Sequence, residues 1–431
     1  MHWNVHRILK SSLSYLSSGL IGTGAMFVMS LIVSRYLGAE GIGLFSLAFA
    51  GVLLGVFVAD FGTNSFIMRE FAPHGRSTLV NLRFIVLLRL TSSVFVAACV
   101  FLAATGTMNH MLLLAAYGSV LIVTRSVGTA LENFLKARLY HGRYLVLTMG
   151  GSIAQVMAVW MALSAGHSLV EVFLILAIID AAKAILLLVM VRRWFGEQQT
   201  VAAQSRRNRL LPILTQCAPF AVIGLLSVLS ERGDLFLLAA FRGAGEAGFF
   251  SAADRFLRIG TLVDSSLLAS SLPILSSIAN RAHADTITRQ MLIILLLLST
   301  SGAIILFAAA PSLIGLTFRF SESVLLLRVL SVALPAIVVG SLIRTSLFAL
   351  RRERSVAWVF GIGCTFNLLL NVLFIPVFGA PGAAVISVFT EYGMVALYGI
   401  TYLRHVRTLT ASGDHRLQLH AGIVETLEPS A

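Results

Sequence analysis

The sequence Arg35-Tyr36-Leu37-Gly38-Ala39-Glu40-Gly41-Ile42-Gly43-Leu44-Phe45-Ser46 returns in the second half of the chain as Arg242-Gly243-Ala244-Gly245-Glu246-Ala247-Gly248-Phe249-Phe250-Ser251. Each copy is a short glycine-rich turn that carries one glutamate and lies between two apolar segments of membrane length. The chain is therefore a duplication. Because both copies have the same place in their halves, the two halves share one topology and are related by an axis along the membrane normal. This geometry is typical of transporters that rock two bundles about a central cavity.

The composition places the chain in a lipid bilayer. Hydrophobic residues make up 58% of the 431 positions and charged residues only 12%, whereas about a quarter of the residues of a soluble globule are charged. The first apolar stretch, at 13–33, is longer than the core of a signal peptide, so we expect it to remain as the first span. The net charge of +13 belongs with a membrane surface here, and we expect no nucleic-acid partner.

The apolar segments predict an all-α integral membrane protein with about twelve transmembrane helices. They form two six-helix bundles related by a parallel repeat, at 12–191 and 211–403, and a basic cytoplasmic linker at 192–210 joins them. Residues 1–11 are expected to form a cytoplasmic amphipathic segment, and residues 404–431 a cytoplasmic tail that is disordered from about Thr408. The spans are predicted at about 12–36, 42–64, 83–106, 111–135, 144–164, 169–191, 211–241, 247–275, 290–310, 323–349, 356–377 and 382–403.

The basic residues predict the orientation of the chain. Lys and Arg concentrate in the two termini and in every second connection, for example at Arg192 and Arg193. The opposite connections hold Arg35, Arg242 and Arg319. By the positive-inside rule, both termini are cytoplasmic.

The sequence has no nucleophile motif, phosphate-binding loop, metal-ligand spacing or ATPase signature. The three cysteines, Cys99, Cys217 and Cys364, lie in apolar segments without paired spacing. We therefore expect a transporter rather than an enzyme, with no catalytic residue, metal or bound cofactor.

Charged residues inside the predicted spans are the candidates for function. Each costs roughly 2.5–3.5 kcal/mol at the centre of a span, so as a group they must face a wet cavity or one another. Asp180 and Lys183 are expected to neutralise each other on one helix, and Arg328 to extend toward the membrane surface. Asp264 and Glu391 have no evident partner, and two alternatives stay open: they line a cavity, or they are capped by neighbouring helices.

Arginines near mid-depth predict an anionic cargo. Arg125, Arg255 and Arg258 are all about 12–21 Å from the outer ends of their spans. A guanidinium group offers a fork of donors suited to phosphate oxygens and keeps its proton when it is buried. The alternative is that these arginines only pair with Asp254, Asp234 or Glu231 on adjacent helices. The substrate-binding candidates are Arg125, Arg255, Arg258, Arg89, Arg232 and Arg344.

Two acidic residues are candidates for coupling or gating. Asp234 is expected at the depth of Arg255 on the neighbouring helix, where the pair is either a fixed brace or a switch that opens when phosphate competes for the arginine. Asp60 has a comparable place in the other half and is a candidate for taking up a proton.

Three further passages join the first turn in resembling a known family. They are Ala59-Asp60-Phe61-Gly62 followed by Arg69-Glu70; Glu231-Arg232-Gly233-Asp234-Leu235-Phe236 running into Gly248-Phe249-Phe250-Ser251-Ala252-Ala253; and Asn367-Leu368-Leu369-Leu370-Asn371 through Ile375-Pro376 to Gly379-Ala380-Pro381-Gly382-Ala383-Ala384. Together these motifs resemble the MOP superfamily and, within it, the bacterial polysaccharide or O-antigen flippases.

The resemblance implies a two-lobed flippase of the bacterial inner membrane. Such a protein moves an undecaprenyl-diphosphate-linked oligosaccharide to the outer leaflet by alternating access, for O-antigen, capsule or exopolysaccharide biosynthesis. The family is expected to hold the diphosphate and sugars in a cationic cavity while the lipid tail stays in the bilayer. The implied partners are this anionic lipid-linked oligosaccharide, the bilayer, a polysaccharide polymerase and chain-length proteins, and the implied energy source is an H⁺ or Na⁺ gradient.

Two other functions are kept as alternatives. A cation-coupled multidrug exporter of the same superfamily requires an acidic site, and many such exporters carry an acid in the first span, where residues 12–34 of this chain hold no charge. A non-transporting scaffold of a polysaccharide assembly complex requires no buried arginines.

Overall fold

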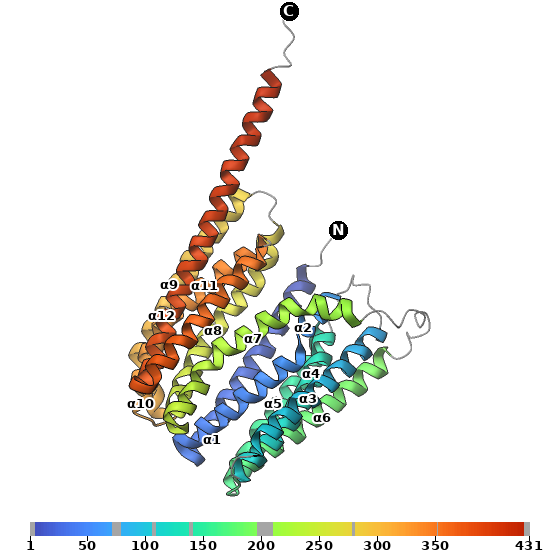
Figure 1. Cartoon of the computed structure of the whole chain (residues 1–431), viewed down its shortest axis with the longest axis vertical. Helices are drawn as coiled ribbons and strands as arrows, with labels where there is room; N and C mark the ends of the chain where they lie inside the picture. The colour runs from blue at the N-terminus through green and yellow to red at the C-terminus, as the bar shows by residue number, and fades with distance from the viewer. Residues whose placement is uncertain are drawn as a thin grey trace, which may run out of the picture.

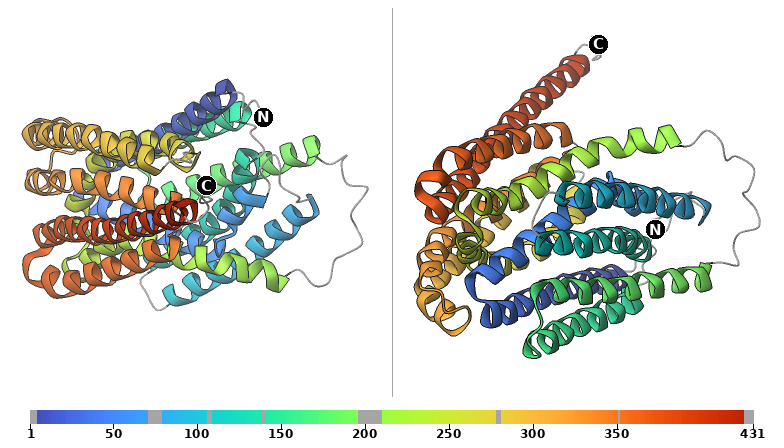
Figure 2. Two further views of the ribbon diagram at one scale, coloured as in Figure 1. Left: turned by 90° about the horizontal axis from the view of Figure 1, so that it is seen from above. Right: turned by 60° about the horizontal axis from the view of Figure 1, so that its bottom comes forward.

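The computed structural model describes residues 5–70, 79–105, 109–137, 141–195, 210–277, 281–350 and 352–425. Within these ranges the regular structure is entirely helical. The N-terminal lobe contains α1 (Val5–Asp60), α2 (Thr63–Glu70), α3 (Leu79–Ala104), α4 (Asn109–Ala137), α5 (His141–Ser164) and α6 (Leu169–Phe195). The C-terminal lobe contains α7 (Leu210–Arg242), α8 (Ala244–Ser277), α9 (Arg281–Leu316), α10 (Glu322–Ser331), α11 (Ala333–Ala349) and α12 (Glu353–Glu425). Figures 1 and 2 show the two lobes as bundles of long helices.

The helices confirm the predicted all-helical membrane fold. Eight segments are long and apolar enough to cross a membrane. Two of them are double, because α1 bends at Gly38 and α12 bends at Gly379, where the backbone leaves the helical region. The helices α10 and α11 together form a single crossing. The remaining long helices, α7 and α8, are those that carry most of the charged residues discussed below.

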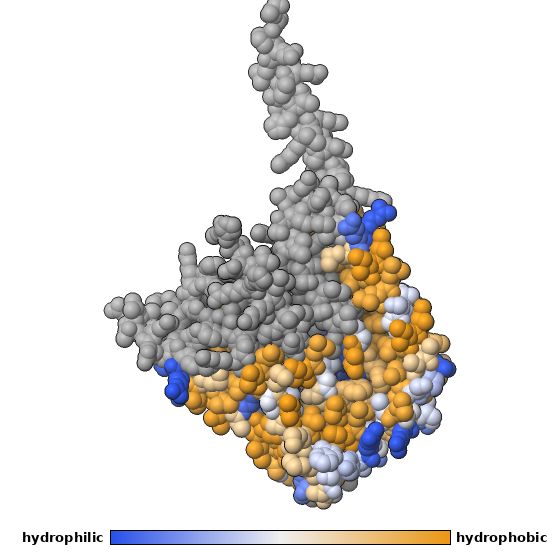
Figure 3. Space-filling view, turned by 180° about the vertical axis from the view of Figure 1, so that it is seen from behind, coloured by the Kyte–Doolittle hydropathy of each residue, from blue (hydrophilic) through white to orange (hydrophobic). Residues whose placement is uncertain are grey.

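Lipid-facing apolar side chains cover the outside of the bundles. Phe95, Leu297 and Trp358 are about 70% exposed, at 69%, 68% and 74%. Figure 3 shows that apolar side chains dominate the coloured part of one face. Such a surface is favourable only against hydrocarbon, so the chain is a multi-pass membrane protein.

The two copies of the duplicated turn pack against each other. Gly38 and Gly243 both have positive φ, at 67° and 89°. The hydroxyl groups of Ser46 and Ser251 are 2.6 Å apart and belong to residues separated by 205 positions. The same offset relates Ala39 to Ala244 and Gly43 to Gly248, and each glycine lies against the carbonyl group of the alanine in the other copy. The duplication is therefore visible as a local two-fold contact between the lobes.

The glutamate of the second turn also holds a third turn. Glu246 Oε1 accepts a hydrogen bond from Arg242 Nε at 3.1 Å, and Oε2 accepts one from the backbone N–H of Ala380 at 2.9 Å. This ties the α7–α8 turn to the bend in α12 at Gly379. On the same side of the protein, Arg35 Nη2 donates to the Leu316 carbonyl oxygen at 3.4 Å. We call this end of the lobes, with the Gly38 and Gly243 turns, the closed end.

The helix α7 packs on both lobes. Near its start, Cys217 is fully buried in an apolar cluster of the N-terminal lobe that contains Phe66, Leu131 and Phe134. Near its end, Leu238 belongs to the core that the lobes share at the closed end. Figure 1 shows α7 running from beside α2 down to the turn that leads into α8.

The ends of the chain differ from expectation in two ways. The helix α1 begins at Val5 and continues into the first span, so no break separates the N-terminal segment from the membrane helix. The expectation of a disordered tail was wrong as far as Glu425, because α12 continues to that residue as a helix. Most of the predicted linker, at 196–209, lies outside the described residues.

Candidate functional site

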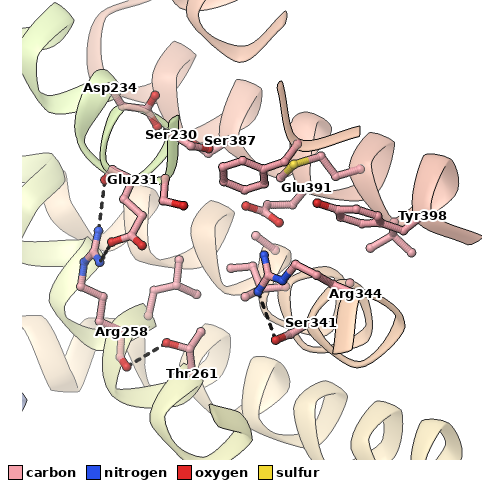
Figure 4. Close-up of a pocket in the computed structure, with 18 of the residues that line it drawn as sticks. Ser230, Glu231, Asp234, Arg258, Thr261, Ser341, Arg344, Ser387, Glu391 and Tyr398 are labelled. Carbon is pink, nitrogen blue, oxygen red and sulfur yellow. Dashed lines mark hydrogen bonds and ion pairs between the residues drawn. The ribbon is translucent and has the colours of Figure 1, made fainter. Parts of the chain in front are cut away.

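A cavity of about 490 Å³ lies inside the C-terminal lobe, mainly between α7, α8, α11 and α12. Figure 4 shows its polar side chains converging from these helices. The charged residues that line it are Glu231, Asp234, Asp254, Arg258, Arg344 and Glu391. Its volume falls within the roughly 300–1,000 Å³ that is usual for small-molecule sites.

Arg258 is held in this cavity by two carboxylates. Its Nε is 2.6 Å from Asp254 Oδ2, one turn earlier on α8. Its Nη1 is 3.3 Å from Glu231 Oε2, and Nη2 donates to the Glu231 carbonyl oxygen at 3.2 Å. Arg232 is more distant, with Nη1 3.9 Å from Asp254 Oδ2. For Arg258, the alternative of pairing across adjacent helices is therefore what the structure shows.

Among the described residues, the side chains that donate hydrogen bonds to Asp234 are neutral. Asn371 Nδ2 donates to its Oδ1 at 2.8 Å, and Ser387 Oγ donates to its Oδ2 at 2.6 Å. The predicted pair with Arg255 is wrong, because α12 rather than α8 supplies the partners of this carboxylate. Asn371 is fully buried, and its Oδ1 has no hydrogen-bond partner in the described part of the chain.

Arg344 lies across the cavity from Arg258 (Figure 4). Its Nη2 donates to Ser341 Oγ at 3.3 Å. In the described residues, no carboxylate comes within the 4.0 Å that defines an ion pair with it. Glu391, whose environment the sequence left open, also lines this cavity, and Tyr398 lies nearby. Glu391 is thus a cavity residue.

The N-terminal lobe has its own cavity, of about 300 Å³, between α1, α4, α5 and α6. Arg125 Nε is 2.5 Å from Asp180 Oδ2, and its guanidinium carbon is 4.5 Å from the centroid of the Phe49 ring. Lys183 Nζ is 2.5 Å from Glu132 Oε1. The predicted Asp180–Lys183 pair is therefore wrong, because both residues of α6 take partners from α4.

Arg89 and Asp60 form a buried ion pair away from both cavities. Arg89 is 0% exposed and Asp60 is 4% exposed. Arg89 also donates to Thr63 Oγ1 at 2.8 Å and to the Ser126 carbonyl oxygen at 2.7 Å. Asp60 Oδ1 accepts from the backbone N–H of Asn64 at 2.9 Å, so the same carboxylate caps the start of α2. This arrangement is that of a structural brace.

Arg255 lies between the lobes. It is 6% exposed, and its Nη2 donates to Ser46 Oγ at a long 3.4 Å. Its Nε has no hydrogen-bond partner among the described residues. Arg328 is placed with its guanidinium carbon 5.4 Å from the Phe307 ring centroid. The side chain of Asp264 lies outside the described residues.

The predicted arginines thus do not form one site, and Arg89 lies in neither cavity. Arg125 lines the N-terminal cavity, Arg258 and Arg344 line the C-terminal cavity, and Arg255 lies at the lobe junction. The position of a residue along its helix predicts its depth in the membrane, but it does not show which cavity the side chain faces. Sequence reasoning missed four residues that line the cavities: Glu132, Gln155, Ser341 and Ser387. It also missed that Asn371 donates a hydrogen bond to Asp234. Only Asn371 carried a signal, as part of a quoted motif.

Comparisons with known proteins agree on the fold. An inward-facing multidrug resistance MATE family transporter of the MOP superfamily is 14% identical, with 92% of this chain and 99% of that chain covered and a TM-score of 0.70. A MOP superfamily transporter from Pyrococcus furiosus is 15% identical, with 94% and 96% covered and a TM-score of 0.67. A Vibrio cholerae MATE transporter is 14% identical, with 94% and 97% covered and a TM-score of 0.65.

No curated protein matched the sequence. A family model described as "Polysaccharide biosynthesis protein" matches residues 8–279, which is more than half of the chain. This match includes the first copy of the duplicated turn, the second copy and both charged helices α7 and α8. The chain therefore belongs to the polysaccharide biosynthesis protein family and has the fold of MOP superfamily transporters.

Proposed function

We propose that this protein is a flippase that moves an undecaprenyl-diphosphate-linked oligosaccharide across the bacterial inner membrane for O-antigen, capsule or exopolysaccharide synthesis. Three observations support the proposal: the family match, the two-lobed transporter fold, and a charged cavity in each lobe. A polysaccharide polymerase and chain-length proteins are the proposed downstream partners, because the flipped oligosaccharide must be polymerised outside the membrane.

The observation that carries the proposal is the position of Arg344. It faces the C-terminal cavity opposite Arg258 and has no carboxylate at ion-pair distance in the described ranges. Arg344 is partly buried and its interaction with Glu391 acts beyond ion-pair distance, so its guanidinium donors favour an anionic ligand in the cavity. The diphosphate supplies two phosphoryl groups, one for Arg344 and one able to compete with Asp254 and Glu231 for Arg258.

The structure represents the inward-open state in this proposal. The inter-lobe contacts of Gly43, Ser46, Gly248 and Ser251 lie at the closed end. The termini lie toward the opposite end in Figure 1. With both termini cytoplasmic, as the basic residues predict, the closed end faces the periplasm.

Replacing Arg344 by Gln is expected to reduce surface polysaccharide at least tenfold without changing the amount of protein in the membrane. The reason is that the diphosphate loses a cationic partner, while none of the ion pairs found among the described residues is broken. Polymer is measured on the cell surface, and lipid-linked oligosaccharide is measured in the membrane, where it should accumulate. Arg319→Gln, at an exposed arginine outside the cavity, is the matched control. Unchanged polymer in Arg344→Gln cells would contradict the proposed phosphate site.

One observation favours cation export as a second candidate. The C-terminal cavity is lined by four acids, Glu231, Asp234, Asp254 and Glu391, against two arginines. A cationic substrate would find acidic partners there. Deletion of the gene separates the candidates, because an exporter's loss raises sensitivity to cationic drugs and leaves polymer intact. A scaffold is separated by Arg344→Gln, since a protein that only assembles a complex needs no cavity residue.

We further propose that Asp234 binds the coupling cation, either H⁺ or Na⁺. Its donors, Asn371 and Ser387, are neutral, so a bound cation would compensate its charge. The unpartnered Oδ1 of Asn371 lies on the side chain that contacts Asp234 and is an additional oxygen ligand for Na⁺.

Asp234→Asn is expected to abolish polymer export at normal protein abundance, because the carboxamide keeps the hydrogen-bonding shape but cannot take up a cation. In wild-type cells, a sodium ionophore and a protonophore show which gradient is used. Asn371→Asp serves as a comparison that retains a carboxylate in the site. Normal export by Asp234→Asn would remove this residue from coupling.

A further inference from the structure

The cavity of the N-terminal lobe differs in chemistry from that of the C-terminal lobe. Its charged residues are Arg125, Lys183, Glu132 and Asp180, two bases and two acids, and the bases are paired with the acids. Its formal charge is therefore zero. Because each base is already at ion-pair distance from an acid, this cavity offers no separate cation to a diphosphate and no separate acid to an organic cation. A balanced polar cavity instead suits a neutral ligand that both donates and accepts hydrogen bonds.

One wall of this cavity is a polar stripe on α5. Thr148, Ser152 and Gln155 follow one another at helical spacing, and all three line the cavity. Gln155 Nε2 donates to Asp180 Oδ1 at 2.9 Å, which anchors the stripe to the Arg125–Asp180 pair. Thr148 is 8% exposed, and its hydroxyl group has no hydrogen-bond partner in the described chain. An unsatisfied buried hydroxyl group in a polar cavity is a site for a ligand hydroxyl group.

A second part of the cavity lining comes from α1 and is apolar. Gly22, Ala25, Met26 and Met29 line the cavity from the first span. A methionine face packs well against the C–H face of a ring because its side chain is unbranched and polarisable. At Gly22 a Cβ atom would meet nothing within 4 Å, so the space beside this glycine is open.

We propose that the N-terminal cavity is a saccharide subsite, in which one or two neutral sugar residues of the cargo bind between the polar stripe on α5 and the methionines of α1. The inference rests on the proposed function, since it assigns the sugars to one lobe and the diphosphate to the other. Paired carboxylates and bases supply both acceptors and donors for sugar hydroxyl groups, and the volume of about 300 Å³ is too small for a long oligosaccharide. The subsite selects the cargo by its sugar, independently of the phosphate.

The test measures binding of a probe that has no lipid and no phosphate. The probe is the reducing oligosaccharide released by mild acid from the polyprenyl-linked pool of the host cells. Its binding to the full-length protein in lipid nanodiscs is measured by saturation-transfer difference NMR. We expect binding that inorganic pyrophosphate does not displace and that Arg344→Gln leaves unchanged. Displacement by pyrophosphate, or no binding to the wild-type protein, would overturn the proposal.

Two glycines of one helix provide a matched pair of variants. Gly22→Leu places a side chain in the open part of the cavity and is expected to weaken probe binding at least tenfold. Gly24→Leu adds the same side chain two residues further on, where a Cβ atom also meets nothing within 4 Å and no cavity residue is displaced. It is expected to bind the probe as the wild-type protein does. Equal binding by both variants would place the sugar elsewhere.

A further variant removes the hydroxyl group of Thr148. Thr148→Val keeps the shape of the side chain and removes its hydroxyl group, and we expect a severalfold weaker binding of the probe.

Failure of the saccharide subsite can be told apart from failure of the proposed function. If gene deletion abolishes polymer but Gly22→Leu binds the probe normally, only the subsite is wrong. If deletion leaves polymer intact, the proposed function is wrong.

Discussion

Gly248→Val is expected to abolish surface polysaccharide while the protein still inserts and accumulates in the membrane. In the closed end, a Cβ atom at Gly248 would lie 1.9 Å from the Ala39 carbonyl oxygen and 2.9 Å from its carbon. Both are backbone atoms, which cannot move aside as a side-chain rotamer can. The lobes must therefore separate at this end, and the proposed inward-open state is lost.

The same turn contains a control for this substitution. Gly245→Val adds the same side chain at a position where a Cβ atom meets nothing within 4 Å. Its polymer level should remain near that of the wild-type protein. The state of the lobes is measured directly by the distance between spin labels on the closed-end turns, which should lengthen only in Gly248→Val. A normal distance and normal polymer in Gly248→Val would show that the turns do not form the gate.

Arg89→Met is expected to destabilise the N-terminal lobe strongly. Removing one partner of a buried ion pair commonly costs about 3–5 kcal/mol, because the other charge is left without compensation. Here the loss is larger than a simple pair, since Arg89 also holds Thr63 and the Ser126 carbonyl group beside the start of α2. The measurement is the thermal unfolding temperature of the purified protein in detergent, together with its abundance in the membrane.

The double variant Asp60→Asn with Arg89→Met distinguishes a brace from a coupling site. A brace predicts that the double variant recovers part of the stability lost in Arg89→Met, because no uncompensated charge remains. A proton-coupling role for Asp60 predicts that the double variant is stable but inactive in export. Recovered stability together with normal export would remove Asp60 from coupling and leave Asp234 as the candidate.

The misassigned ion pairs show where sequence reasoning ended. Asp180 and Lys183 are close in the sequence, so a local pair was the natural prediction. In the fold, α4 lies beside α6 and brings Arg125 to Asp180 and Glu132 to Lys183. The same is true of Asp234, whose depth was compatible with Arg255 but whose partners come from α12. Spacing along one helix predicts height, and the choice of neighbour depends on how helices are rotated against each other.

The sequence by itself determined the duplication, the membrane location and the all-helical fold of twelve crossings. These properties depend on composition, on the length of apolar segments and on repeated glycine turns, all of which are local in the chain. Only the tertiary structure decided which charges are neutralised, which lobe each cavity belongs to, and that Gly43 and Gly248 meet across the two-fold contact. An ion pair requires atoms within a few ångströms. That distance is set by packing between helices far apart in the sequence, so no local pattern contains it.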